Sequence, residues 1–184
     1  MTILDIRVLG DPVLRKATEP VAEVTDTVRA LIADMFDTMH AAEGIGLAAP
    51  QVGRSERIAV IDVDGDRYAL INPEVVAREG AARAEEGCLS IPEVFGDVTR
   101  ATTVVVRAFD ENGAEIELKG SDLLARCMQH EIDHLDGKLF IDYLSVLKRR
   151  SAMTKWDRLK GDYPGFVRRV LLEPRGSEHS EGEL

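Results

Sequence analysis

Residues 121–137, which read SDLLARCMQHEIDHLDG, are the stretch around which the rest of the chain is organised. Ser121 is a good helix N-cap and Gly137 is a good C-terminal stop, so the pattern predicts a helix between them. Positions i and i+4 of a helix lie one above the other, so His130 and His134 can reach the same metal ion. Glu131 can approach a water molecule on that ion and exchange a proton with it. The stretch therefore predicts a helical metal site.

Two histidines do not complete a catalytic metal site, which usually has three protein ligands and an open position. No histidine follows before His179, and residues 143–153 contain no glutamate that could serve instead. The two cysteines remain as candidates. Cys127 sits among apolar residues of the predicted helix, which is more typical of a buried thiol. Cys88 lies in the glycine-containing segment EEGCLSIP (85–92), and its spacing favours it as the ligand only modestly.

A thiolate with two imidazoles is a soft ligand set that suits zinc or ferrous iron. Both cysteines are expected to be reduced, because two cysteines in a chain of 184 residues do not make a disulfide framework. The remaining histidines, His40 and His179, are expected to be ordinary surface residues.

Hydrophobic periodicity and turn signals predict the elements outside the central helix. Apolar residues recur with helical spacing from Thr25 to Met39, and a third helix is expected from Ser145 to about Lys160. The small residues and helix breakers of 47–53 predict an irregular segment. Strand-forming runs separated by Asp-Gly or Asn-Gly predict two β-hairpins, formed by 58–63 with 68–71 and by 103–109 with 115–118.

These elements predict an α+β domain, in which antiparallel hairpins and sheets surround the central helix that carries the His-Glu-x-x-His motif. We expect the domain to span residues 1–165 and to be followed by a partly disordered extension, 166–184. No apolar run approaches the length of a membrane span, and the first residues have no secretory signal character. The sequence therefore predicts a cytoplasmic protein.

The charge balance narrows the range of partners. The chain has 33 acidic and 23 basic side chains, with a formal net charge of −10, so general binding to nucleic acid is not expected. The segment Lys148–Lys160 is an exception because it gathers six basic residues. It is either a solvated helix face or a docking surface for an anionic partner such as ribosomal RNA.

Three motifs together resemble those of the peptide deformylase family. They read GIGLAAPQ (44–51), EGCLS (86–90) and QHEIDH (129–134), and they occur in the family's order at similar separations. The similarity extends from about Leu9 to Leu159 and includes LFIDYL (139–144).

The resemblance implies an enzyme that removes the formyl group from the initiator methionine of nascent polypeptides and releases formate. It implies that Cys88, His130 and His134 hold the metal, usually ferrous iron, although zinc, nickel or cobalt can occupy such ligands. A water molecule on the metal would act as the nucleophile, with Glu131 as general base and then general acid.

The resemblance also implies roles for residues outside the metal-binding motif. The Gln51 side chain and the Leu89 backbone N–H would stabilise the oxyanion, and the Gly46 backbone would face the substrate. Ile45 and Cys127 would line the pocket for the methionine side chain. Asp133, within the QHEIDH motif, has two alternatives that do not rest on the resemblance: it either orients an imidazole or is exposed to solvent.

Two other classes of protein share part of this pattern. A zinc endopeptidase also carries two histidines and a glutamate in this helical spacing, but it does not explain the Gly-Cys-Leu-Ser segment or the missing downstream ligand. A binding module with a structural Cys-His-His zinc site is the non-enzymatic alternative, and such a site normally has a fourth protein ligand.

Overall fold

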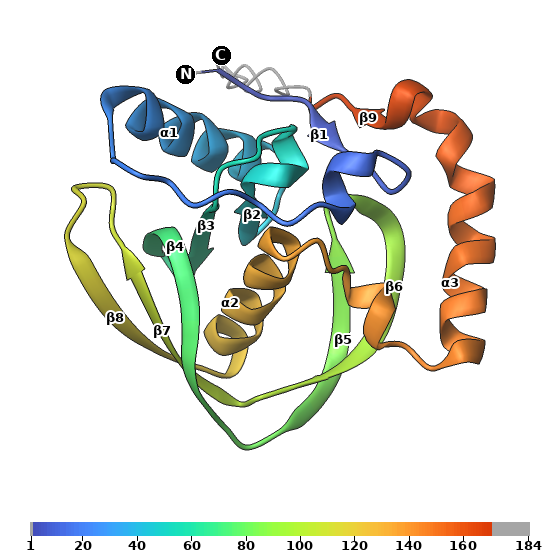
Figure 1. The fold of residues 1–184 in the computed structure, drawn as a ribbon. Coiled ribbons are helices and arrows are strands. Elements are labelled where there is room, and N and C mark those ends of the chain that lie inside the picture. Colours follow the sequence, from blue (N-terminus) through green and yellow to red (C-terminus); the bar gives the residue numbers. More distant parts are fainter. Residues whose placement is uncertain (1, 171–184) are drawn as a thin grey trace, which may run out of the picture.

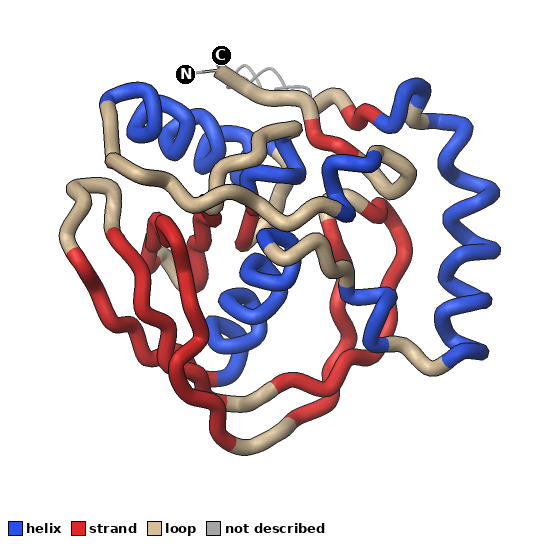
Figure 2. The backbone as a smooth tube through the Cα atoms, viewed as in Figure 1, coloured by secondary structure: helices blue, strands red, loops and turns tan. Residues whose placement is uncertain are grey.

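The computed structural model describes residues 2–170 and shows a mixed helix and sheet fold (Figures 1 and 2). The predicted mixture of helices and strands is confirmed. The helices and strands, in chain order, are β1 (Ile6–Arg7), α1 (Asp26–Ala41), β2 (Gly46–Ala48), β3 (Ile58–Val63), β4 (Asp66–Glu79), β5 (Ala82–Cys88), β6 (Ile91–Arg100), β7 (Thr103–Phe109), β8 (Glu115–Ser121), α2 (Asp122–Leu135), α3 (Val146–Leu159) and β9 (Val167–Arg168). Short 3₁₀ turns occupy Pro12–Arg15, Ala49–Val52, Phe140–Tyr143, Lys160–Asp162 and Pro164–Phe166.

The strands form three antiparallel sheets. The largest has the order β2-β3-β4-β7-β8, so the short strand β2 is one of its edges. The β5–β6 hairpin forms a second sheet, and β1 pairs with β9 in a third. Both predicted hairpins are present as β3–β4 and β7–β8, although β4 continues eight residues beyond the predicted end at Ile71.

Helix α2 lies between the five-stranded sheet and the β5–β6 hairpin, as Figure 1 shows, and packs against β2, β3 and β8. The core between α2 and the sheet contains Ile61, Leu70, Val106, Met128 and Ile132. A second core lies between α1 and strands β2 and β3, and a third between β6 and α3. Burial of these apolar faces holds α2 in the middle of the molecule.

The helices match their predicted positions closely. The Thr25 hydroxyl caps α1 by accepting from the Val28 N–H, and the Ser145 hydroxyl caps α3 in the same way. The Ser121 side chain, in contrast, makes no capping hydrogen bond at α2. No helix within residues 2–170 combines the length and apolar character needed to cross a bilayer.

The prediction of an irregular segment over 47–53 was wrong. Leu47 and Ala48 belong to β2, which pairs with β3, and residues 49–52 form a 3₁₀ turn. Cross-strand hydrogen bonds and complete burial of this strand outweigh the weak β-propensity of its small residues.

Two features of the fold were not predicted from the sequence. The β5–β6 hairpin was not predicted because most of β5 is exposed and therefore lacks an alternating apolar pattern. Strand β9 is only two residues long and pairs with β1 near the start of the chain. The predicted boundary after residue 165 stays a prediction, and residues 171–184 of the extension lie outside the described residues.

Candidate metal and active site

Two histidines of α2 project toward the β5–β6 hairpin. His130 and His134 are one helical turn apart, and their ring centroids are separated by 5.0 Å. Both imidazoles are largely buried. The helix therefore presents two imidazoles that could bind one metal ion.

The hairpin brings Cys88 to that point. Cys88 is the last residue of β5, and its Sγ lies 3.1 Å from His134 Nε2. The ligand atoms of Cys88, His130 and His134 all lie within 4.8 Å of one another. Cys127 is not part of this group, because it is buried with its Sγ 3.5 Å from the Ile45 carbonyl oxygen.

This donor set fits a divalent transition metal. One thiolate and two imidazoles are ligands typical of zinc and ferrous iron, and three protein ligands leave a coordination position open. The imidazole of His134 has a buried Nδ1 with no hydrogen-bond partner among the described residues. Packing and the contact of Nε2 with Cys88 therefore hold the His134 ring, and no described residue forms a hydrogen bond with its Nδ1.

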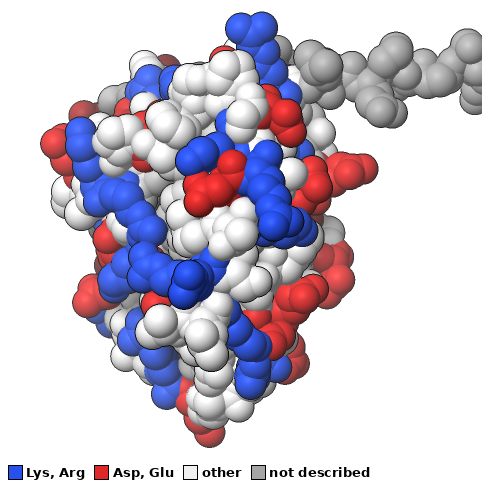
Figure 3. Space-filling view, turned by 90° about the vertical axis from the view of Figure 1, so that its right-hand side faces the viewer, with Lys and Arg blue, Asp and Glu red and all other residues white. Residues whose placement is uncertain are grey.

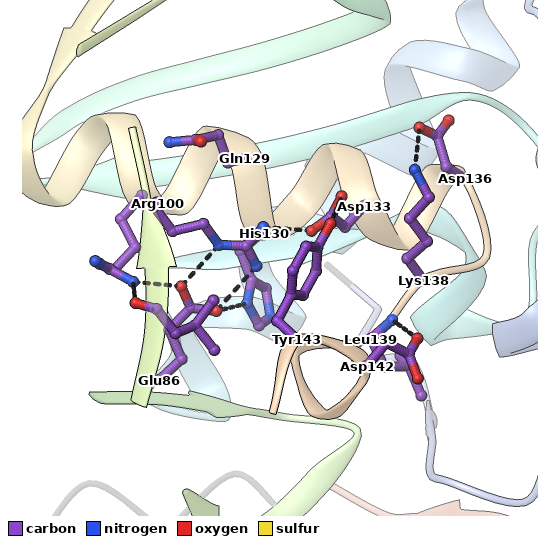
Figure 4. Close-up of polar contacts among 12 residues, drawn as sticks. Glu86, Arg100, Gln129, His130, Asp133, Asp136, Lys138, Leu139, Asp142 and Tyr143 are labelled. Carbon is purple, nitrogen blue, oxygen red and sulfur yellow. Dashed lines mark hydrogen bonds and ion pairs between the residues drawn. The ribbon is translucent and has the colours of Figure 1, made fainter. Parts of the chain in front are cut away.

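A buried carboxylate fixes the other imidazole. Glu86 Oε2 lies 3.0 Å from His130 Nδ1, and Arg100 donates to both oxygens of Glu86 at 2.9 and 3.0 Å (Figure 4). Arg126 donates to Glu86 Oε1 at 2.7 Å. Since an ionised Glu86 accepts the Nδ1–H of His130, the Nε2 of that ring keeps its lone pair for a metal.

Glu86 stays ionised although its side chain is only 4% exposed. Burial alone would raise its pKa, but the hydrogen bonds from His130 and Arg100 outweigh burial and hold the pKa well below the usual range. The carboxylates of Glu86 and Asp133 raise the pKa of Arg100 against the opposing effect of burial. Glu86 and Arg100 therefore form a buried ion pair beside His130.

Asp133 extends this network on its far side. It pairs with Arg100 and accepts a 2.9 Å hydrogen bond from the Tyr143 hydroxyl, while the Arg100 guanidinium stacks over the Tyr143 ring at 4.6 Å (Figure 4). Asp133 is buried, which rules out the alternative that it is exposed to solvent. It also makes no hydrogen bond to an imidazole among the described residues, and it acts instead on Arg100.

Glu131 is buried and lines the same cleft as the candidate metal ligands Cys88 and His130. Its Oε2 is buried with no hydrogen-bond partner in the described part of the chain. Burial raises its pKa to about 7, against a smaller opposing effect of His130. A carboxyl group in this environment can both accept and return a proton.

Gly46 allows the Glu131 carboxylate to occupy this place. A Cβ on Gly46 would overlap Glu131 Oε1 and would lie 2.8 Å from Cys127 Sγ. Only glycine therefore lets the β2 backbone approach α2 this closely.

Gln51 is held in a fixed orientation at the same site. Its Oε1 accepts the Ala48 N–H at 2.8 Å, which turns its Nε2 toward Ser90 Oγ (3.2 Å) and Cys88 Sγ (3.6 Å). Leu89 follows Cys88 in the turn between β5 and β6, and we find no hydrogen bond from its N–H to a backbone carbonyl among residues 2–170. Two neutral donors thus lie next to the ligand cluster.

A cleft of about 480 Å³ opens onto this cluster. Its walls include all of the predicted catalytic and substrate-binding residues, namely Ile45, Gly46, Gln51, Leu89, Cys127 and Glu131, together with the ligands Cys88 and His130. The volume is typical of a site for a small ligand or a few residues of peptide. His40 lies elsewhere, half-exposed and paired with Asp62 at 2.8 Å, and His179 is outside the described residues.

Comparison with known proteins gives a consistent result. The model of the family described as "Polypeptide deformylase" matches residues 3–150. A peptide deformylase of Alkalilimnicola ehrlichii is 53% identical over 163 residues, which cover 86% of this chain and 92% of that protein. One from Nitrosococcus oceani is 50% identical over 161 residues, covering 86% of this chain and 96% of the relative.

Solved structures agree with the sequence matches. The crystal structure of a peptide deformylase from Legionella pneumophila superposes with a TM-score of 0.84 at 48% identity, covering 87% of this chain and 96% of that one. The peptide deformylase from Ehrlichia chaffeensis, in complex with actinonin, gives a TM-score of 0.84 at 40% identity. The match covers 89% of this chain and 99% of that chain.

The fold, the site and these matches define a metal-dependent hydrolase that acts on an N-formyl amide bond. The chain belongs to the polypeptide deformylase family, whose model covers most of its length. Its activity is the removal of the N-formyl group from nascent peptides.

The sequence did not reveal Glu86 and Arg100, the buried pair that contacts the candidate ligand His130 through Glu86. They are separated by 14 residues along the chain, and Arg100 is 33 residues from Asp133, so no local pattern connects them. The only available signal was the position of Glu86 within the EGCLS motif, two residues before Cys88.

We predict that Glu86→Gln lowers metal affinity by about 10- to 100-fold, because the imidazole of His130 loses its charged acceptor. Glu85→Gln is the matched control, since it makes the same change at an exposed neighbouring position of β5. Metal retention is measured by competition with a chelator, after circular dichroism has shown that each variant is folded. Equal retention by the two variants would contradict the role assigned to Glu86.

Proposed function

We propose that this deformylase hydrolyses its substrate in the cleft beside α2, with Cys88, His130 and His134 holding one divalent ion and Glu131 moving the proton. The observation that carries this proposal is the convergence of the three ligand atoms within 4.8 Å, next to the buried carboxylate of Glu131, whose Oε2 has no hydrogen-bond partner among the described residues. We further propose ferrous iron as the ion in the cell, with zinc, nickel or cobalt as replacements, and the cytoplasm as the place of action.

The residues around the ion divide the chemistry between them. A divalent ion at these ligands supplies a Lewis acid that lowers the pKa of water toward neutrality. Glu131 accepts a proton from the attacking water and then donates it to the amine that leaves with the peptide. As the formyl carbonyl becomes tetrahedral, Gln51 Nε2 and the Leu89 N–H donate to its oxygen, and one such donor is worth roughly 3 kcal/mol.

The substrate is placed by the two walls of the cleft. β2 is an edge of the five-stranded sheet, and β5 pairs only with β6 among the described strands. An extended peptide can add to such edges through backbone hydrogen bonds. Ile45, Gly46 and Cys127 line the cleft at the β2 side and are proposed to surround the methionine side chain.

The proposal predicts that Glu131→Gln retains its metal but releases formate from formyl-Met-Ala-Ser about a thousandfold more slowly, because the proton acceptor is lost. Iron-loaded and zinc-loaded proteins are compared without oxygen, and metal content is measured on the same samples. Undiminished formate release by a fully metallated Glu131→Gln protein would refute the role of Glu131.

A second prediction concerns the approach of β2 to α2. Gly46→Ala places a methyl group against the Glu131 carboxylate and should lower kcat by about a hundredfold through displacement of this group. Gly161→Ala is the matched control, since a Cβ there meets nothing within 4 Å. Equal kcat values for the two variants would show that Glu131 does not need this close approach.

We also propose that α3 contacts the ribosome. Figure 3 shows that lysine and arginine side chains gather on the face of the molecule where α3 lies. Arg150, Lys155 and Arg158 surround a shallow groove on this helix together with Leu147, which is 80% exposed. Clustered basic side chains around a hollow suit the phosphates of ribosomal RNA.

Charge reversal at Lys148, Arg149 and Arg150 is therefore expected to weaken co-sedimentation with ribosomes while formate release from a short peptide persists. Unchanged ribosome affinity would rule out this surface.

A further inference from the structure

The segment after α3 returns to the active-site cleft. β9 pairs with β1 so that Arg168 lies opposite Ile6, and the Val8 N–H donates to the Phe166 carbonyl oxygen at 2.9 Å. This segment lies beyond residues 3–150, which the family model matches. One wall of the cleft is therefore formed by residues 163–168, which lie outside the three motifs shared with the family.

Packing holds this wall on both sides. The Phe166 ring lies over Gly10, where even a Cβ would be within 2.9 Å of three ring atoms. The Tyr163 ring stacks on Trp156, with centroids 5.8 Å apart and an interplanar angle of 17°. Two aromatic contacts and a strand pairing thus fix the path of residues 163–168.

Arg168 and Tyr163 both line the cleft that contains His130 and Glu131. The Arg168 side chain is partly buried, and its Nη1 lies 3.5 Å from the carbonyl oxygen of Leu89, whose N–H is a proposed oxyanion donor. The guanidinium is therefore close to the place where the scissile bond is proposed to lie.

The two arginines of the cleft differ in their partners. The donors of Arg126 are used within the protein. Its guanidinium donates to Glu86 at 2.7 Å and to the carbonyl oxygens of Val98 and Ala82 at 2.9 and 2.8 Å. Arg168, within the described part of the chain, makes only the long contact to Leu89 and pairs with no carboxylate. Most of its five donors remain available to a ligand.

We propose that Arg168 is a specificity-determining residue that binds an acidic side chain of the substrate at the second or third position, after the formylmethionine. This inference rests on the proposed path of the peptide through the cleft. A guanidinium matches a carboxylate by two parallel hydrogen bonds, so aspartate and glutamate are the side chains that it favours. An extended peptide advances about 3.3 Å per residue, so the residues just after methionine are those within reach of the wall.

The test compares pairs of isosteric peptides that end in an amide and therefore carry no terminal carboxylate. One pair is formyl-Met-Glu-Ser-amide and formyl-Met-Gln-Ser-amide, and the other is formyl-Met-Ala-Glu-amide and formyl-Met-Ala-Gln-amide. For at least one pair, kcat/KM of the wild-type protein should be about three- to tenfold higher for glutamate, the range expected for a partly exposed ion pair. The difference should lie in KM, because the contact is equally strong in the ground state and the transition state.

Arg168→Gln is expected to abolish this preference, whereas Arg168→Lys keeps part of it. Arg169→Gln is the matched control, since it removes the same charge at the next residue, which is exposed and does not line the cleft. The preference should also shrink at high salt.

Three results would overturn the proposal: no glutamate preference in either pair, a preference that survives in Arg168→Gln, or the same loss in Arg169→Gln. A uniform fall of kcat for all four peptides in Arg168→Gln would also overturn it, since it would mean that Arg168 only supports Leu89. The glutamine peptides keep the two proposals apart, because their hydrolysis by the wild-type protein and its loss in Glu131→Gln support the reaction in this cleft whatever Arg168 binds.

Discussion

The buried contact between Glu86 and His130 is the interaction on which the site depends. It joins β5 to α2, and Arg100 at the end of β6 closes the same cluster. Charges taken out of water are tolerated only when they are paired, and removing one member of such a cluster typically costs about 3–5 kcal/mol. The hairpin is therefore locked to the helix in one register, and Cys88, two residues after Glu86, is held opposite His134.

The remaining parts of the site follow from this lock. Once the hairpin is fixed, the turn after β5 brings Leu89 to the cleft and places the buried Ser90 Oγ 3.2 Å from Gln51 Nε2. On the opposite wall, Gly46 lets β2 come close enough to α2 to bury Glu131. The site thus needs two segments to lie close to α2. The charged cluster holds the β5–β6 hairpin there on one side, and the absence of a side chain at Gly46 lets β2 approach on the other.

The sequence was informative where the signals were local. The periodicity of α1, the turn residues of the two hairpins and the spacing of His130 and His134 each depend on fewer than about 20 consecutive residues, and all were predicted near their observed positions. Spacing favoured Cys88 over Cys127 only modestly, and resemblance to a known family strengthened that preference. The Glu86–Arg100 pair beside His130 could not be predicted, because its members come together from distant positions through the pairing of β5 with β6, and β5 has no alternating apolar pattern. The return of Arg168 to the cleft depends in the same way on β9, which is too short to leave a sequence signal.

X-ray absorption of the zinc-loaded protein identifies the atoms that bind the metal. We expect one sulfur at about 2.3 Å and two imidazole nitrogens at about 2.0 Å from the zinc ion. The sulfur should disappear in Cys88→Ala and persist in Cys127→Ala. A wild-type spectrum without sulfur, or one whose sulfur remains in Cys88→Ala, would show that Cys88 does not hold the metal.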